Sequence, residues 1–235
     1  MKALAALMLM TAMFFAAGCK PEDGPNNGGN NGGGNDSIID THEYVDLCLP
    51  SGTLWATCNV GAETTGGYGD YFAWGETQPK EVYDWSTYKY CNGSYNNLTK
   101  YCDNEEFGSD HFTDTLNVLL PEDDAATANW GEGWRMPTYD EWVELDQNTT
   151  QTWVNQNGVD GRLFTAENGN SLFLPGAGFC NENYHLCYGD GFYWASSLGT
   201  SYPYYGKHFY FVGGSNQFFG YRCQGIPVRP VRSAH

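Results

Sequence analysis

The chain has 235 residues and a formal net charge of −17 at pH 7, from 28 acidic residues against 11 lysines and arginines. Such a field repels nucleic acid and anionic membrane surfaces, so the composition argues against both as partners. Because aromatic residues make up 16% of the chain and charged residues only 17%, we expect a surface rich in tyrosine, asparagine and glycine, as in extracellular binding surfaces, or else a tyrosine-rich core.

Residues 1–18 are predicted to be a lipoprotein signal peptide. Lys2 precedes an apolar run, residues 3–17, that is too short for a comfortable transmembrane helix. The run leads into Ala-Ala-Gly before Cys19, which resembles a bacterial lipobox, although Ala16 stands where leucine is usual. We therefore expect lipidation of Cys19 and a lipid-anchored protein of the outer membrane, exposed at the cell surface. An ordinary cleaved signal with a chance cysteine is the alternative.

The mature chain divides into a tether and one domain. Residues 19–40 are rich in glycine and asparagine, lack any periodicity and cannot bury apolar surface, so they read as a flexible tether after the lipidated cysteine. Residues 41–235 are long enough for a single domain with its own core.

The first half of the domain alternates between regular and irregular patterns. Residues 43–62 predict a β-hairpin around a Pro-Ser-Gly turn. Residues 63–120 are dense in glycine, tyrosine, tryptophan and asparagine without a period, which predicts long loops that pack by their aromatic side chains. Two short helices should follow. The first begins at Pro121 among acidic residues, and the second begins at the capping box of Thr138 and Glu141.

The second half, residues 159–232, reads as strands separated by Gly-Asn and Gly-Asp turns. Hairpin, loops, helices and strands together predict an α+β fold in which two short helices pack on antiparallel sheets. Alternation in the segment KHFYFV would bury Phe209 and Phe211 and expose His208 and Tyr210.

The expected export of the protein bears on the pairing of its cysteines. Eight cysteines are present, so lipidation of Cys19 leaves an odd number, and at least one is unpaired or pairs with another chain. The exported side of the membrane can oxidise thiols, and Cys91 with Cys102 and Cys180 with Cys187 would close short loops. These two pairs are the predicted disulfides.

Several motifs in fixed order carry a family resemblance: YGDYFAWGET, PEDDAATANWGEGWRMPTYDEW, NGNSLFLPGAG, YWASSL and VRPVR. Together they resemble the Fibrobacter succinogenes major paralogous domain, a family frequent in surface lipoproteins of gut Bacteroidetes. The resemblance covers residues 43–232 and implies a C-type-lectin-like fold, shared with the sulfatase-modifying factors. In that fold the Trp-Arg-Met-Pro-Thr segment is a structural signature and not a catalytic motif.

The remote likeness to formylglycine-generating sulfatase modifiers supports an alternative hypothesis, that the protein is an enzyme. Those enzymes hold copper with a close cysteine pair, and Cys180 and Cys187, with His185 between them, are the tempting equivalents. The Gly-Gly-Ser-Phe context of the enzymes is absent and the spacing differs. We therefore expect no catalysis and no resident metal at these cysteines.

Calcium is the other candidate ligand, because many lectins of this fold hold sugars through Ca²⁺. The Glu-Pro-Asn or Gln-Pro-Asp triplets and the Trp-Asn-Asp triplet of those lectins are missing here. One acidic loop could still supply oxygen ligands to a structural calcium ion, although a solvated loop is the commoner outcome. Its carboxylates are Asp103, Glu105, Glu106 and Asp110.

A binding face is expected near the C-terminus, in residues 197–225, where the related variable proteins of diversity-generating retroelements bind their ligands. The candidate residues are Tyr202, Tyr204, Tyr205, His208, Tyr210, Phe218, Phe219 and Tyr221. These rings could stack on sugars or form a protein contact. The expected function is a non-catalytic binding or adhesion module for glycan or protein ligands. A structural or accessory subunit of a surface assembly, such as a fimbrial tip, is the alternative, and a sulfatase-modifier-like enzyme is the third reading.

Overall fold

The computed structural model describes residues 42–186, 189–199, 202–211 and 219–234. The regular secondary structure of these residues is mostly β-sheet, with two short α-helices, α1 (Ala125–Trp130) and α2 (Tyr139–Gln147). This composition fits an α+β or a mainly β class. Cys19 and the tether lie outside the described residues.

The first sheet joins the two ends of the described chain. Its strands are β1 (Tyr44–Asp46), β2 (Thr53–Ala56) and β13 (Val231–Ser233), in the order β1-β2-β13, and both pairs are antiparallel. The turn between β1 and β2 is closed by the amide of Gly52, which donates to the carbonyl of Leu49 at 2.9 Å. The hairpin predicted for residues 43–62 is confirmed.

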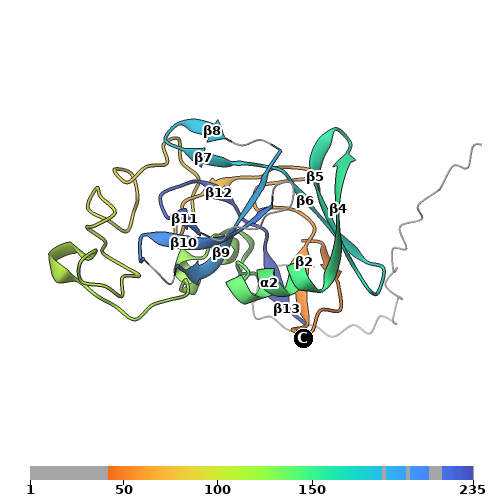
Figure 1. The fold of residues 1–235 in the computed structure, drawn as a ribbon, viewed down its shortest axis with the longest axis horizontal. Coiled ribbons are helices and arrows are strands. Elements are labelled where there is room, and N and C mark those ends of the chain that lie inside the picture. Colours follow the sequence, from red (N-terminus) through yellow and green to blue (C-terminus); the bar gives the residue numbers. More distant parts are fainter. Residues whose placement is uncertain (1–41, 187–188, 200–201, 212–218, 235) are drawn as a thin grey trace, which may run out of the picture. The chain divides into compact units, whose positions relative to one another are not determined.

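A second antiparallel sheet follows α2 and has the order β4-β5-β6. It consists of β4 (Thr149–Gln156), β5 (Val159–Ala166) and β6 (Ser171–Pro175). Asn157 and Gly158 connect β4 to β5, and their φ angles of 53° and 88° are those of a type I′ turn, whose twist suits a hairpin. The hairpin stands at the right-hand side of the fold in Figure 1.

The third sheet lies in the middle of the fold and has the order β11-β10-β9. It contains β9 (Gly191–Leu198), β10 (Tyr205–Phe211) and β11 (Phe219–Tyr221), and its register shifts between Gly206 and His208. Two smaller sheets complete the β-structure: β3 (Tyr71–Phe72) pairs with β12 (Ile226–Pro227), and β7 (Phe179–Asn181) pairs with β8 (Tyr184–Leu186).

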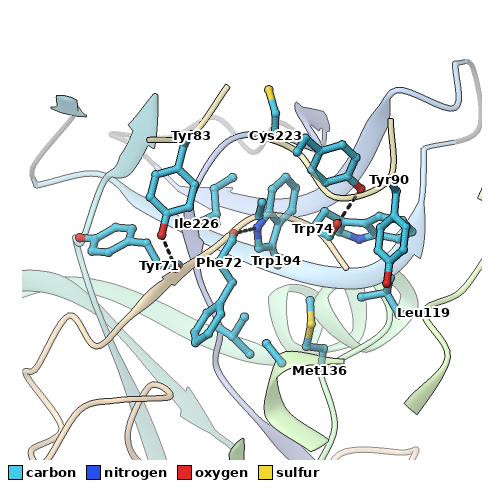
Figure 2. Close-up of a cluster of buried hydrophobic side chains, with 14 of the residues drawn as sticks. Tyr71, Phe72, Trp74, Tyr83, Tyr90, Leu119, Met136, Trp194, Cys223 and Ile226 are labelled. Atoms are coloured by element: carbon cyan, nitrogen blue, oxygen red, sulfur yellow. Dashed lines mark hydrogen bonds between the residues drawn. The ribbon is translucent and has the colours of Figure 1, made fainter. Parts of the chain in front are cut away.

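Two hydrophobic cores meet at this third sheet. The sheet core lies under α2 and the β4-β5-β6 sheet, and includes Leu47, Leu49, Trp55, Trp142, Leu145, Phe164, Leu172, Leu174, Tyr193, Phe209 and Phe211. The loop core is assembled largely by residues 71–126, which contain only β3, the 3-10 helices η1 (Ser109–His111) and η2 (Pro121–Asp123), and the start of α1. It includes Tyr71, Phe72, Trp74, Tyr83, Tyr88, Tyr90, Tyr101, Leu119, Met136, Trp194, Cys223 and Ile226. Figure 2 shows part of this core, with Tyr83, Trp194 and Trp74 among its labelled rings.

The helix starts follow from their capping residues. Asp124 caps α1 by accepting from the amides of Ala126 and Thr127 at 2.9 and 3.0 Å. The predicted capping box of α2 is confirmed, since Thr138 accepts from the Glu141 amide at 3.3 Å while the Glu141 carboxylate accepts from the Thr138 amide at 2.8 Å.

Candidate functional site

Among the described residues, seven aromatic rings form a continuous cluster at the surface, which we call the aromatic patch. Its members are Trp85, Tyr95, Phe107, Tyr202, Tyr204, Tyr205 and Tyr221. Tyr95, Tyr202 and Tyr221 keep 46, 47 and 44% of their surface exposed. The rings come from the long loops and from both strands of the β10–β11 pair, so residues far apart in sequence build one surface.

Tyr204 lies at the centre of the patch and contacts rings on each side. Its centroid is 4.6 Å from that of Tyr205, 5.1 Å from Phe107, 5.2 Å from Tyr202 and 5.3 Å from Tyr95. Most of these pairs are tilted or edge-to-face, arrangements that the quadrupoles of aromatic rings favour. A set of mutually packed rings holds its shape, so a ligand would meet a largely preformed surface.

The pairing of β10 with β11 positions two further rings of the patch. Tyr205 of β10 is directly opposite Tyr221 of β11 in the register, and their rings stack with centroids 5.1 Å apart. Burial of its hydroxyl, with the hydrogen bond and charge of Tyr221, raises the pKa of Tyr205 to about 12. This hydroxyl therefore stays protonated at neutral pH and can donate a hydrogen bond.

A buried arginine ties the segments behind the patch together. Arg222 is fully buried and follows Tyr221 in the chain. Its guanidinium donates to the carbonyl of Pro203 at 2.9 Å, which lies between two rings of the patch, and to the hydroxyl of Tyr88 at 2.8 Å. It also donates to the carbonyls of Lys100 and Tyr101 at 3.0 and 3.1 Å. One side chain thus fixes the loop of residues 100–101 against the turn that carries the tyrosines.

Backbone hydrogen bonds anchor the loop rings. The amide of the buried Leu98 donates to the carbonyl of Phe107 at 2.8 Å, which holds the Phe107 loop beside the turn that carries Tyr95. Beside Trp85, Asp84 accepts from the hydroxyl of Ser86 at 2.7 Å and from nearby amides. These hydrogen bonds, that from the Ser86 side chain first, lower the pKa of Asp84, so a negative charge stands next to the patch at neutral pH.

The structure brings together four of the residues predicted for the binding face, Tyr202, Tyr204, Tyr205 and Tyr221. Phe218 lies outside the described residues, and only the backbone of Phe219 is described, in β11. Those two assignments stay predictions.

His208 was expected at the surface and is buried instead. The alternation was right for Phe209 and Phe211, which are buried in the sheet core. The opposite face of β10 is covered as well, because the loop core packs there, and the His208 ring lies 5.9 Å from that of Trp194. Burial lowers the pKa of His208 to about 3. Tyr210 is half-buried against Phe192 at 4.4 Å, and we place neither residue in the patch.

Trp85, Tyr95 and Phe107 were missed by the sequence reasoning. The density of aromatic residues in residues 63–120 was visible, but without a period nothing indicated which rings point outward. Only the contact between these loops and the turn at Tyr204 identifies them.

The cysteines differ from the predicted pairing. Cys91 and Cys102 are free thiols, and the predicted disulfide between them is absent from the structure. The reason is geometric: the Cys91 thiol is directed at the carbonyl of Trp85 and the Cys102 thiol at that of Asn104, both at 3.1 Å.

The second predicted disulfide is absent from the structure as well. Cys187 lies outside the described residues, but Cys180 is a free thiol. The Sγ of Cys180 lies 3.2 Å from Nδ1 of His185, and burial raises the pKa of Cys180 to about 12. A thiol with such a pKa is protonated at neutral pH and is a poor nucleophile.

The acidic loop is exposed at Asp103, Glu105, Glu106 and Asp110. Within the described part of the chain, no three or more His, Cys, Asp or Glu side chains gather as they would around a metal ion. Calcium binding by this loop stays a prediction, which calorimetric titration with Ca²⁺ would test. Glu105 and Glu106 directly precede Phe107 in the chain, so they add negative charge beside the patch.

Comparisons of the chain with family models, with curated proteins and with solved structures returned no match. Among the described helices, none combines the length and the apolar character that spanning a bilayer requires.

Proposed function

We propose that the protein is a non-catalytic carbohydrate-binding module and that the aromatic patch binds an uncharged oligosaccharide. The observation that carries the proposal is the continuity of the patch: seven packed rings, of which Tyr95, Tyr202 and Tyr221 are nearly half exposed. Contiguous exposed apolar surface on a soluble domain marks a recognition site more often than chance packing.

The chemistry of the rings fits a sugar. The apolar C–H face of a pyranose ring can lie on an aromatic face, while its hydroxyl groups need hydrogen-bond partners at the edge. Tyrosine supplies both an apolar face and a polar tip, and it loses little conformational entropy on binding. Tyr202 meets this description, because nearly half of its surface is exposed.

The charges around the patch select the class of sugar. Asp84 adjoins Trp85, and the exposed Glu105 and Glu106 adjoin Phe107. These carboxylates repel uronic acids, sialic acid and sulfated sugars, and the net charge of −17 adds to the repulsion at long range. Neutral sugars are therefore the ligands that the patch would favour.

The test is a glycan array followed by calorimetry on the best ligand, with Tyr202→Ala as the variant. Tyr44→Ala is a matched control, since Tyr44 is 51% exposed but lies on β1, outside the patch. We expect Tyr202→Ala to weaken binding at least about tenfold, as loss of a stacking ring commonly does, and Tyr44→Ala to leave it unchanged. A neutral oligosaccharide that binds both variants equally well would contradict the assignment of the site.

If no glycan on the array binds the protein, a protein ligand becomes the favoured class. Copurification of a protein partner, lost in Tyr202→Ala, would then support the alternative of an accessory subunit in a surface assembly. A silent array with no such partner would overturn a binding role for the patch.

We extend the proposal to the family of the protein, to its fold and to its location in the cell. The pairing of β13 with the β1–β2 hairpin and the position of two short helices before the central sheet support a C-type-lectin-like domain of the Fibrobacter paralogous type. We propose that lipidation at Cys19 holds this domain at the outer surface of the outer membrane. Metabolic labelling with an alkyne fatty acid would test the anchor, since Cys19→Ala should abolish the label.

A further inference from the structure

Strand β4 forms an open edge of the second sheet. In a hairpin with a two-residue turn, the residues that flank the turn exchange hydrogen bonds, and the pattern then alternates along the strands. Gln156 and Val159 flank the turn, so the N–H and C=O groups of every second residue of β4 point away from β5. These outward-facing residues are Thr149, Gln151, Trp153 and Asn155. Among the described residues, no hydrogen bond reaches the backbone groups of these four.

The edge lacks the devices by which monomeric proteins usually block strand addition. Its sequence, TTQTWVNQ, contains no charged residue and no proline. The pairing with β5 runs without a bulge from Thr149 opposite Ala166 to Gln156 opposite Val159. Edge strands that remain solvent-exposed are normally short, bulged, charged or interrupted by proline. A regular neutral strand of eight residues is suited to accept another strand.

The exposure of the Trp153 side chain also indicates that β4 can accept another strand. It shares a face of the sheet with Phe164, a residue of the sheet core, and its ring lies 6.0 Å from that of Phe211. Nevertheless 45% of its surface is exposed, because in the described part of the chain the sheet ends at β4 and no further strand covers the outer side of the ring. An additional strand would bury this ring as the next strand buries a core residue in a continuous sheet.

We propose that β4 pairs antiparallel with β4 of a second copy of the chain, so that two sheets merge across a two-fold axis. In the register centred on Thr152, all four outward-facing residues of each copy find partners. Gln151 then lies opposite the partner's Trp153, and Thr149 opposite the partner's Asn155. A two-fold interface uses the same segment on both sides, and a strand pairs with itself in this way without any other surface.

A second copy can approach at β4 despite the charge of the chain. Two chains of charge −17 repel each other, so they can pair only where few carboxylates face the contact. The β4 strand itself contains no charged residue, and Arg162, which donates to the side chain of Gln151 at 2.8 Å, partly offsets the charges of Asp146 and Asp160 beside it. The strand also lies away from the aromatic patch: in Figure 1 the loops of residues 85–110 are at the left and β4 is at the right. Pairing through β4 would therefore leave the patches of both copies free.

Disulfide trapping tests the register. At the two-fold axis Thr152 faces the partner's Thr152 as a non-hydrogen-bonded pair, with Cα atoms about 4.5 Å apart, inside the range that a disulfide spans. Thr150→Cys is a matched control, because the same register separates the two cysteines by about 14 Å. The full-length chain in mild detergent is oxidised gently, and the untreated native cysteines in the wild type set the background. We expect covalent dimers to be several-fold more abundant with Thr152→Cys than with Thr150→Cys or the wild type.

Sedimentation velocity across a range of concentrations tests the association itself. Thr152→Lys places two like charges face to face at the axis, and we expect it to raise the dissociation constant of the dimer at least about tenfold. Thr113→Lys makes the same charge change at an exposed loop residue and should behave like the wild type. A chain that stays monomeric at all concentrations would overturn the proposal. So would a dimer that Thr152→Lys leaves intact, or equal trapping at residues 150 and 152.

Discussion

The two cores of this domain lie on opposite faces of the β9–β10 pair and are stabilised by different means. In the sheet core, apolar side chains of α2 and the strands pack together, and the backbone of the strands is satisfied by ladder hydrogen bonds. Most of the loop core is built from irregular segments, which have no ladder. Buried carbonyl groups there need donors from side chains, because an unsatisfied buried carbonyl is costly.

Tyrosines supply these donors in the loop core. The hydroxyl of Tyr83 donates to the carbonyl of Tyr71 at 2.5 Å, that of Tyr88 to Trp74 at 2.7 Å, and that of Tyr71 to Ala177 at 2.6 Å. The first two carbonyls sit at or next to β3, as Figure 2 shows for Tyr83. A tyrosine fills volume as phenylalanine would and also satisfies a loop carbonyl. The high tyrosine content therefore has two explanations in one molecule: some rings replace a β-ladder inside, and others form the aromatic patch outside.

Truncation of one tryptophan in each core should give the largest effect and tests whether the cores unfold together. Trp142 of the sheet core and Trp74 of the loop core are both fully buried, and their Nε1 atoms donate to adjacent carbonyls of β9, those of Trp194 and Ala195, at 3.2 and 2.9 Å. We expect Trp142→Ala and Trp74→Ala each to lower the free energy of unfolding by about 3–5 kcal/mol. Because β9 belongs to both cores, far-UV circular dichroism and tryptophan fluorescence should follow one transition in urea. Separate transitions for Trp74→Ala would mean that the loop core unfolds on its own.

A smaller effect is expected from acid, through the carboxylate at the start of α2. Burial would raise the pKa of Glu141, but Arg135, at 2.6 and 2.7 Å, and the hydrogen bonds from Thr138 and Thr53 outweigh it and lower the pKa to about 2. A lowered pKa stabilises the fold above the unfolded-state value near 4.5, and this stabilisation disappears as the pH falls from about 5 to 2. The loss should reach about 3 kcal/mol. Urea unfolding at several pH values measures it.

Glu141→Gln is the control for this pH dependence. The variant should be less stable than the wild type at pH 7 and should approach it as the pH falls to 2 and below, where the wild-type carboxyl becomes protonated. Asp123 acts in the same direction for the loop core, since hydrogen bonds from Lys100, Tyr101 and Tyr90 outweigh its burial and lower its pKa. An unchanged pH slope in Glu141→Gln would assign the acid sensitivity to the loop core instead.

The parts of the fold that follow local rules could be predicted from the sequence. The Thr138 capping box, the hairpin of residues 43–62 and the alternation that buries Phe209 and Phe211 depend on neighbours within a few residues. Strand β4 was missed, although the Asn157-Gly158 turn is a strong hairpin signal, because its polar, threonine-rich sequence shows little hydrophobic alternation. An edge strand needs only one apolar face, and that face is incomplete here.

The site was harder to predict for a physical reason. Tyr205 and Tyr221 share one β-pair and Tyr204 directly precedes Tyr205, so the proximity of the three rings could be expected. Their contacts with Tyr95 and Phe107 depend on loops closed by long-range hydrogen bonds, such as those of Arg222, which leave no periodic trace. His208 shows the opposite error, since alternation says which face a residue occupies but not whether another layer covers that face.

The smallest expected effect is also the most direct test of the difference between the cores. Tyr83→Phe and Tyr193→Phe each remove one buried hydroxyl, from the loop core and the sheet core, and leave the carbonyls of Tyr71 and Pro175 without these donors. Each should lower the free energy of unfolding by about 1–2 kcal/mol. Hydrogen exchange should separate them. In Tyr83→Phe, amides of the loops around residues 80–90 should exchange faster than global unfolding allows, because no ladder holds them. In Tyr193→Phe, β9 and β10 should exchange only through the global reaction, since their ladder remains. Equal local protection in both variants would show that the tyrosine hydroxyls do not replace the ladder.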